Sequence, residues 1–252
     1  MKRNYLHILV TLLALLLTPV IYAQDKIESD RSDEAEGAKT LGAGGIQAEA
    51  GAYIVNFKSG PSALVGDFSF HYGLFKQVNL VAVVQEGRER VRFMSETSQG
   101  FFPLALGTKV AVLRETQHCP AVSMSAYIQL PFNARTESEA IHWSKAFNLI
   151  AEKELFNKKW NVLANIGLQQ PSNGRRYQLQ TVEVVSYHGF EKVAFMAEHF
   201  AAYDPKDRPQ NNLGIGLSYF LTYNLQLDIS GSSTIGSAMA NKCLSTGLAV
   251  RL

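Results

Sequence analysis

The stretch 213–230, LGIGLSYFLTYNLQLDIS, alternates in hydrophobicity with a period of two residues. That period is typical of β-strands, in which successive side chains point to opposite faces, and differs from the 3.6-residue period of a helix. Small, polar or charged residues such as Gly214, Ser218 and Asp228 share one face. The other face is wholly apolar and carries aromatic residues near the turn; it comprises Leu213, Ile215, Leu217, Tyr219, Leu221, Leu225, Leu227 and Ile229. The stretch therefore predicts a hairpin with its turn at residues 222–224.

The same alternation returns along the chain from residue 46 to the end. It predicts about 12 strands, with hairpin 213–230 supplying the tenth and eleventh; the others are 46–57, 64–74, 78–86, 101–114, 121–132, 143–155, 160–170, 177–187, 193–203 and 243–252. The sequence leaves the facing of 78–86 open. A helical reading is disfavoured, because glycines such as Gly214 and Gly216 cost about 1 kcal/mol each inside a helix.

The connections between these strands alternate in length. Five are short, at 75–77, 115–120, 156–159, 188–192 and 222–224, and most of the others are longer and more polar, at 87–100, 133–142, 171–176, 204–212 and 236–242. Outer-membrane barrels have short periplasmic turns and long extracellular loops. The pattern predicts an all-β, antiparallel transmembrane β-barrel, with both mature ends periplasmic and the long loops outside.

The environment of such a barrel explains the two faces. In lipid every backbone polar group needs a partner within the protein, so a spanning sheet must close, and its outer face must be apolar. Strand 121–132 shows this most clearly, since Ser123, Ser125, Tyr127 and Gln129 lie opposite an apolar set. That set is Val122, Met124, Ala126, Ile128 and Leu130. We expect the apolar set to face lipid and the polar set to face the lumen.

Residues 1–23 predict a secretory signal peptide, because Lys2 and Arg3 precede an apolar run that ends in a small residue, Ala23. An uncleaved anchor is the alternative, although the run is short for a membrane span. Residues 24–45 are polar and have few apolar residues to offset the entropy of ordering. We expect a flexible periplasmic segment there, with a short surface helix over DEAEGAK as the alternative.

Charge and cysteine content limit the classes of partner and site that the chain can have. The chain has 252 residues, 46% of them hydrophobic, and a formal charge of +2 that falls to 0 without residues 1–23. A neutral mature chain argues against a nucleic-acid partner. Cys119 and Cys243 form neither a disulfide framework nor a metal motif. We expect them to stay unbridged, because the predicted topology puts them at opposite rims of the barrel.

Four segments resemble a family of bacterial outer-membrane proteins, the MetA-pathway of phenol degradation family. They are GGIQAEAGAY (44–53), AVSMSAYIQLPF (121–132), FMAEHFAAY (195–203) and GLSYFLTYNLQLDIS (216–230). The resemblance covers most of 44–252. It implies a Gram-negative outer-membrane barrel that moves small, often hydrophobic molecules. One departure is the end of the chain, Val250-Arg251-Leu252, where such barrels usually have an aromatic residue that the assembly machinery reads.

The polar face provides the candidate ligand-contacting and lumen-lining residues. These are Glu49, Asp67, His71, Lys109, Ser125, Tyr127, Gln129, Asn148, Glu152, Asn165, Glu198 and Asp228. They could screen solutes, or they could form a paired network that fills and supports the barrel. The histidines have no metal-ligand spacing, and Ser69 with His71 is the nearest approach to a catalytic pair. We therefore expect no catalytic residue, metal or cofactor.

Two functions follow as alternatives. The first is a channel or transporter for uptake or efflux of a small solute, hydrophobic and aromatic ones included. The second is a closed barrel that serves as a structural or ligand-binding module. The expected partners are outer-membrane lipid, the barrel assembly machinery and the solute; the sequence leaves the oligomeric state open.

Overall fold

The computed structural model describes residues 26–31, 34–56, 62–90, 97–101, 104–130, 143–170, 177–204, 209–236 and 241–252, with the side chains of 85–90 and 97–101 left out. In these residues thirteen strands make one antiparallel sheet: β1 (Ile46–Asn56), β2 (Ser62–Phe75), β3 (Val78–Arg90), β4 (Thr97–Phe101), β5 (Ala105–Leu113), β6 (Ala121–Gln129), β7 (Ser144–Leu155), β8 (Trp160–Gln170), β9 (Gln178–Tyr187), β10 (Val193–Tyr203), β11 (Gln210–Thr222), β12 (Leu225–Ile235) and β13 (Lys242–Arg251). Within the described residues no helix is long and apolar enough to span a membrane.

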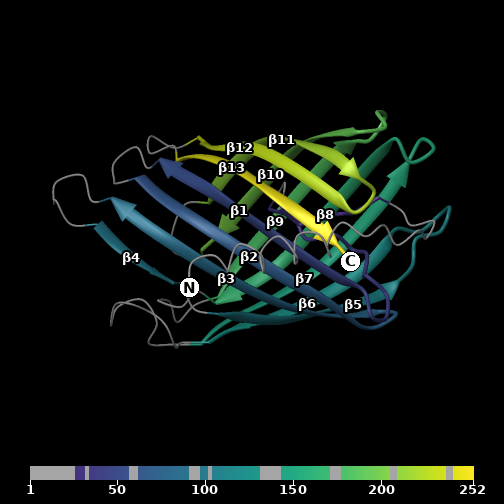
Figure 1. Cartoon of the computed structure of the whole chain (residues 1–252), viewed down its shortest axis with the longest axis horizontal. Coiled ribbons are helices and arrows are strands. Elements are labelled where there is room, and N and C mark those ends of the chain that lie inside the picture. The colour runs from purple at the N-terminus through teal and green to yellow at the C-terminus, as the bar shows by residue number, and fades with distance from the viewer. Residues whose placement is uncertain are drawn as a thin grey trace, which may run out of the picture.

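The sheet closes on itself. Strands that follow one another in the sequence are paired, except β4 and β5, and β1 pairs with β13 over ten residue pairs from Gln47↔Arg251 to Asn56↔Lys242. β4 pairs with the C-terminal end of β3, and β5 pairs with the N-terminal part of β3. The two strands therefore follow one another along the same edge of β3 and count as one strand of the wall. The result is a barrel of twelve wall strands, whose oblique course is visible in Figure 1. The predicted fold class is confirmed.

Several strand boundaries differ from the expectation by a few residues, and one of these differences adds a strand. The sequence predicted that the third strand ends at 86 and that 87–100 is a loop, but β3 runs to Arg90 and pairs with β4. The charged residues of this stretch gave no alternating pattern from which a strand could be predicted. An antiparallel pair is held by backbone hydrogen bonds, so it tolerates polar side chains where the strands extend beyond the lipid.

Side-chain alternation follows the predicted faces. On β6, Ser123 and Ser125 are buried while Met124 is 40% exposed; on β11, Ile215 is 71% exposed and Ser218 is buried. β3, whose facing was open, turns Asn79 and Val81 inward and Leu80 outward. The apolar set therefore covers the outside of the barrel, and the polar set lines the inside.

A contact between a glutamate and a histidine interrupts the apolar outer face. Glu183 on β9 and His199 on β10 are directly opposed, with 2.7 Å between Oε2 and Nδ1. Their neighbours Val184 and Glu198 are buried on the lumen side, so this pair points outward. The glutamate side chain is 54% exposed and the histidine 35%. The sequence analysis did not anticipate an ionisable pair there.

Replacing both members, Glu183→Leu with His199→Leu, should raise the free energy of unfolding by about 1–3 kcal/mol, because it removes two ionisable side chains from the lipid-facing surface. Urea unfolding in phospholipid vesicles measures this. His199→Leu alone should lower stability, since the glutamate then loses its partner. A double variant that is less stable than the wild type would show that the pair serves an interaction which outweighs its desolvation.

The two cysteines are free and belong to opposite rims. Cys119 lies in the turn between β5 and β6, and Cys243 pairs with Val55 and Ser232 at the far end of β13. About 25 Å of tilted strand separates such rims, whereas a disulfide needs Cα atoms within about 7 Å. We therefore expect two free thiols when denatured, unreduced protein is titrated with a thiol reagent; an intramolecular bond would contradict this register.

Candidate functional site

The predicted lumen residues share the inner face. Ten of the twelve (Glu49, Asp67, His71, Lys109, Ser125, Tyr127, Asn148, Glu152, Asn165 and Glu198) line cavities inside the barrel or bond to residues there. Asp228 is buried beside Arg31. Gln129 lies on the same face of β6 as Ser125, at the end of that strand. The structure thus brings the set together, and its role toward a solute stays a prediction.

The sequence predicted a flexible periplasmic segment at 24–45, and the structure corrects this expectation. The described residues from 26 to 41 lie against the inside of the barrel, whereas Ala43 and Gly44 are exposed at its rim, and no helix forms over the described part of DEAEGAK. We call residues 26–45 the inserted segment. The expectation of flexibility came from the small number of apolar residues within the segment. It failed because the apolar and charged partners of the segment belong to the barrel, so the segment needs no core of its own.

The inserted segment enters and leaves at the same rim. At one end, the Ile27 amide donates to the carbonyl of Tyr223 in the β11–β12 turn. At the other, Gly44 donates to the carbonyl of Gly73 on β2, and Thr40 donates to the carbonyl of Lys76. Between these ends, Asp30, Arg31 and Glu36 reach side chains inside the barrel. The segment is therefore a loop inserted from the short-turn side.

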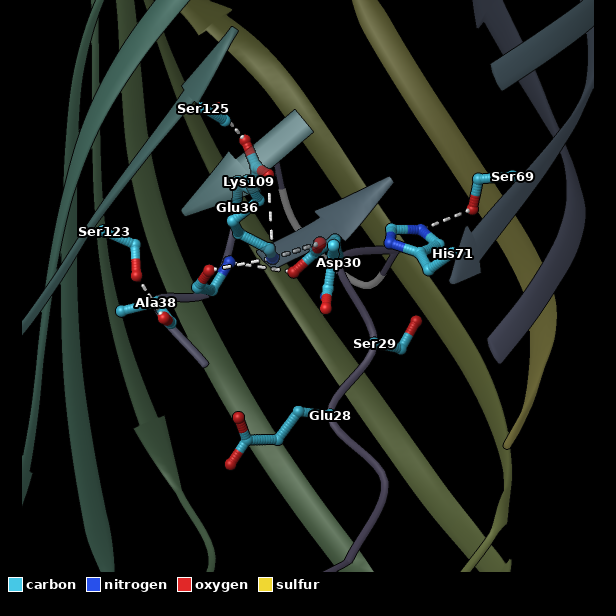
Figure 2. Close-up of polar contacts among 12 residues, drawn as sticks. Glu28, Ser29, Asp30, Glu36, Ala38, Ser69, His71, Lys109, Ser123 and Ser125 are labelled. Atoms are coloured by element: carbon cyan, nitrogen blue, oxygen red, sulfur yellow. Dashed lines mark hydrogen bonds and ion pairs between the residues drawn. The ribbon is translucent and has the colours of Figure 1, made fainter. Parts of the chain in front are cut away.

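Lys109 on β5 holds two parts of this loop together. Its Nζ lies 3.3 Å from Asp30 Oδ2 and 3.6 Å from Glu36 Oε1, and it donates to the Gly37 carbonyl at 3.0 Å. Figure 2 shows these groups converging from the wall and from the segment. Lys109 is 3% exposed, so the two carboxylates compensate a buried charge that would otherwise be costly.

Wall side chains also bind the backbone and carboxylates of the inserted segment. Ser125 and Tyr127 donate to Glu36 at 2.5 and 2.8 Å. Glu198 accepts from the Glu34 amide at 2.9 Å, and Glu152 accepts from the Ala38 amide at 2.8 Å. Ser123 donates to the Ala38 carbonyl, as Figure 2 shows, and Asn165 donates to that of Glu36. With Lys109, and with Asp67 and Asp228, which pair with Arg31, at least eight of the twelve predicted lumen residues have a partner on the inserted segment.

Apolar packing supports these polar contacts. Ala35 and Ala38, both 2% exposed, join a cluster of inward side chains that the wall supplies: Ala121, Ile150, Leu163, Val184 and Met196. Ile27, 1% exposed, joins Ala194, Phe220 and Ala249 nearer the rim. Small residues suit the narrow interior, and their burial favours the inserted position.

Electrostatic pairing keeps Asp30 and Lys39 of the segment charged. Burial raises the pKa of Asp30, but attraction to Lys109 and His71, together with hydrogen bonds from Gly37 and Lys109, holds that pKa below its usual range. Burial lowers the pKa of Lys39, yet the carboxylates of Glu28 and Glu154 raise it above its usual value. Both groups are ionised near neutral pH, so the segment is held by ion pairs as well as by hydrogen bonds.

Cavities remain around the inserted segment. A cavity of about 600 Å³ is lined by Arg31, Glu34 and Glu36 of the segment and by wall residues that include Tyr53 and Ser230. A second, of about 140 Å³, lies around Glu28, Lys39, Gln47 and Arg251. Because acidic side chains outnumber basic ones in the larger cavity, its surface favours polar and cationic groups.

Ser69 and His71 do form a hydrogen bond, at 3.1 Å between Oγ and Nε2. Figure 2 shows the pair beside Asp30, with the dashed contact running only between the serine and the histidine. Within the part of the chain that the structure describes, no group of three or more His, Cys, Asp or Glu residues is arranged to hold a metal.

Sequence reasoning missed the residues of the inserted segment, Asp30, Arg31, Glu34, Glu36 and Lys39. Their signal was present in DKIESDRSDEAEGAK, where charges of both signs lie close together and are followed by alanines. A predicted lumen rich in Asp, Glu and one buried Lys needs partners of opposite charge. That need, set beside the charged N-terminal stretch, could have suggested the insertion.

Solved structures share the fold. The crystal structure of an outer membrane channel from Pseudomonas putida F1 matches with a TM-score of 0.68 and 12% identity, over 90% of this chain and 100% of that one. The NanC porin matches with a TM-score of 0.54 and 10% identity, over 82% and 100%. The KdgM porin matches with a TM-score of 0.56 and 7% identity, over 80% and 98%. These identities show the outer-membrane barrel fold alone.

Among curated proteins none matches this chain. A family model does: residues 29–252 match the family described as "Putative MetA-pathway of phenol degradation". The match begins inside the inserted segment, so it takes in the loop in the lumen as well as the wall. With a closed twelve-strand wall, an apolar outer face and this match over most of its length, the chain belongs to the phenol MetA-pathway family of outer-membrane barrels.

Proposed function

We propose that this protein is an outer-membrane channel for small solutes and that the inserted segment governs access through its lumen. The observation that carries the proposal is the closed barrel with a polar cavity of about 600 Å³ inside it. A cavity of that volume accommodates small molecules. The fold shared with an outer membrane channel and two porins agrees with this function.

The family description points to phenol and related small aromatic compounds as the first solutes to try. The lumen adds a constraint, because the larger cavity presents carboxylates, hydroxyls and amides together with Val81, Val182 and Phe200. Such a lining suits small molecules that combine a ring or short chain with a polar group. We include both uptake and efflux, since a passive channel follows the solute gradient.

A closed barrel without transport is the second candidate, and the inserted segment is the observation that favours it. Polar contacts and apolar clusters fix this segment at many points. In that case the lumen residues serve as structural partners of the segment, or as a ligand site reached from one rim only.

Export and assembly belong to the same proposal. Residues 1–23, outside the described part, would direct secretion and be removed, and 46–252 would enter the outer membrane with the help of the barrel assembly machinery. The turns at the short-connection rim would be periplasmic. We propose neither an enzymatic activity nor a cofactor.

Planar-bilayer conductance and liposome swelling test the channel function. The mature protein is measured beside a variant designed to displace the segment, Ala35→Glu with Ala38→Glu. Current or swelling from either protein supports a channel, and faster swelling with phenol-sized solutes than with disaccharides supports small solutes. If both proteins are correctly folded and neither conducts, the closed structural barrel is the better description.

A further inference from the structure

Four lumen-facing residues form one row across the strands where the barrel closes. In the ladder, Asp67 on β2 is paired with Gly51 on β1, Gly51 with Gly247 on β13, and Gly247 with Asp228 on β12. Directly paired residues in an antiparallel sheet project from the same face. The row therefore has an aspartate at each end and a floor of two glycines.

The guanidinium group of Arg31 occupies this row. Nη1 forms an ion pair with Asp67, and Nη2 donates to the Thr246 carbonyl at 3.2 Å and to Ser245 Oγ at 3.5 Å. A Cβ at either Gly51 or Gly247 would overlap the guanidinium, so the missing side chains make room for a flat group against the wall. The Arg31 side chain is only 5% exposed.

Arg31 does not use all the acceptors of this row. The side chain of Asp228 is fully buried, and its nearest approach to Arg31 is 3.7 Å at Nε, which is too long for a hydrogen bond. Asp67 Oδ1 and both carboxylate oxygens of Asp228 accept no hydrogen bond from the described residues. A buried carboxylate without hydrogen bonds is costly, and the tether of Arg31 to its own backbone limits how well it serves both ends.

We propose that the row formed by Asp67, Gly51, Gly247 and Asp228 is a binding site for guanidinium-bearing solutes, with Arg31 as its resident occupant. A planar group with five N–H donors suits two facing carboxylates, and a point-charge ammonium does not reproduce that geometry. A solute without the tether can centre itself between the aspartates and compete with Arg31. The effect of this binding on permeation rests on the proposed channel function, but the binding itself does not.

Binding is measured with ¹³C-labelled guanidinium at non-denaturing concentrations, through the line broadening caused by folded protein in detergent micelles. Arg31→Ala should bind at least about fivefold more tightly than the wild type, because the site is then vacant. Adding Asp228→Asn to Arg31→Ala should weaken binding about tenfold or more, as expected for the loss of a charged hydrogen-bond acceptor. Adding Glu183→Gln instead, on the outer face, should change nothing.

Urea, which is planar but neutral, should not displace the labelled ion, and methylammonium should displace it only weakly. Heat-modifiable gel mobility checks the fold of each variant, and Asp67→Asn replaces Asp228→Asn if the latter does not fold. Equal binding by the wild type and Arg31→Ala, or binding that survives both aspartate substitutions, would overturn the assignment.

Conductance separates this inference from the channel proposal. In the variant Ala35→Glu with Ala38→Glu, guanidinium should reduce the potassium current, and Asp228→Asn should relieve that block. Current that guanidinium leaves unchanged would refute the site's role in the pore and leave the channel proposal standing. Absence of any current would count against the channel, and the binding measurements would still decide the site.

Discussion

Replacing Ala35 and Ala38 together by glutamate should raise the mean conductance of the barrel by at least about tenfold, the factor that corresponds to 1.4 kcal/mol. Both alanines are buried among Ile150, Leu163, Val184 and Met196. A carboxylate placed there lacks a cation, and Glu152, which bonds to the Ala38 amide, would repel it. Leaving an uncompensated charge buried costs about 3–5 kcal/mol, which favours release of the segment into water.

The control for this prediction is Ala43→Glu, on the same segment but at an exposed position. It adds the same group without burying it, so conductance should match the wild type. Single-channel recordings in planar bilayers measure the effect, and heat-modifiable mobility confirms that each barrel has formed. If the double variant is folded and conducts like the wild type, the inserted segment does not limit the current.

Ile215→Arg should nearly abolish correct assembly. Ile215 is the most exposed of the large apolar side chains described on the outer face apart from Phe156, and it lies near the middle of β11. An arginine facing lipid at mid-depth costs about 2–4 kcal/mol, which is a large share of the stability of a small barrel. The yield of folded, heat-modifiable protein in outer-membrane fractions measures it.

The matched control is Ser230→Arg. Ser230 lies on the neighbouring strand β12, and its side chain lines the 600 Å³ cavity, where a guanidinium finds water and carboxylates. It should assemble close to the wild-type level. Similar yields from the two variants would contradict the assignment of the faces.

The wall was predictable from sequence because lipid imposes a simple rule on it. Residues such as Met124 and Ile215 must be apolar, and Ser125 and Ser218 beside them need not be, so the period of two persists along every strand. The rule stops at the rims, which is why the pairing of β3 with β4 was missed. It also fails for Glu183 and His199, because each gives the other a polar partner across two neighbouring strands.

The inserted segment was not predictable by the same reasoning. Whether a stretch is ordered was judged from its own composition, but Ala35, Ala38 and Ile27 are buried by side chains that come from β6 to β13. The partners of Asp30 and Glu36 likewise lie on strands far away in the sequence: Asp30 pairs with Lys109, and Glu36 accepts a hydrogen bond from Ser125. Contacts across such sequence separations leave no local period, so only the balance of charges hinted at them.

The position of Arg31 has a consequence for the order of biogenesis. Its aspartates belong to β2 and β12, and the glycines beneath it belong to β1 and β13, the first and last strands to be synthesised. The place that Arg31 occupies therefore does not exist until the two ends of the sheet have met. Docking of the N-terminus would be the final step of maturation, and a nascent barrel that stalls before closure would keep that segment exposed to periplasmic proteases and chaperones.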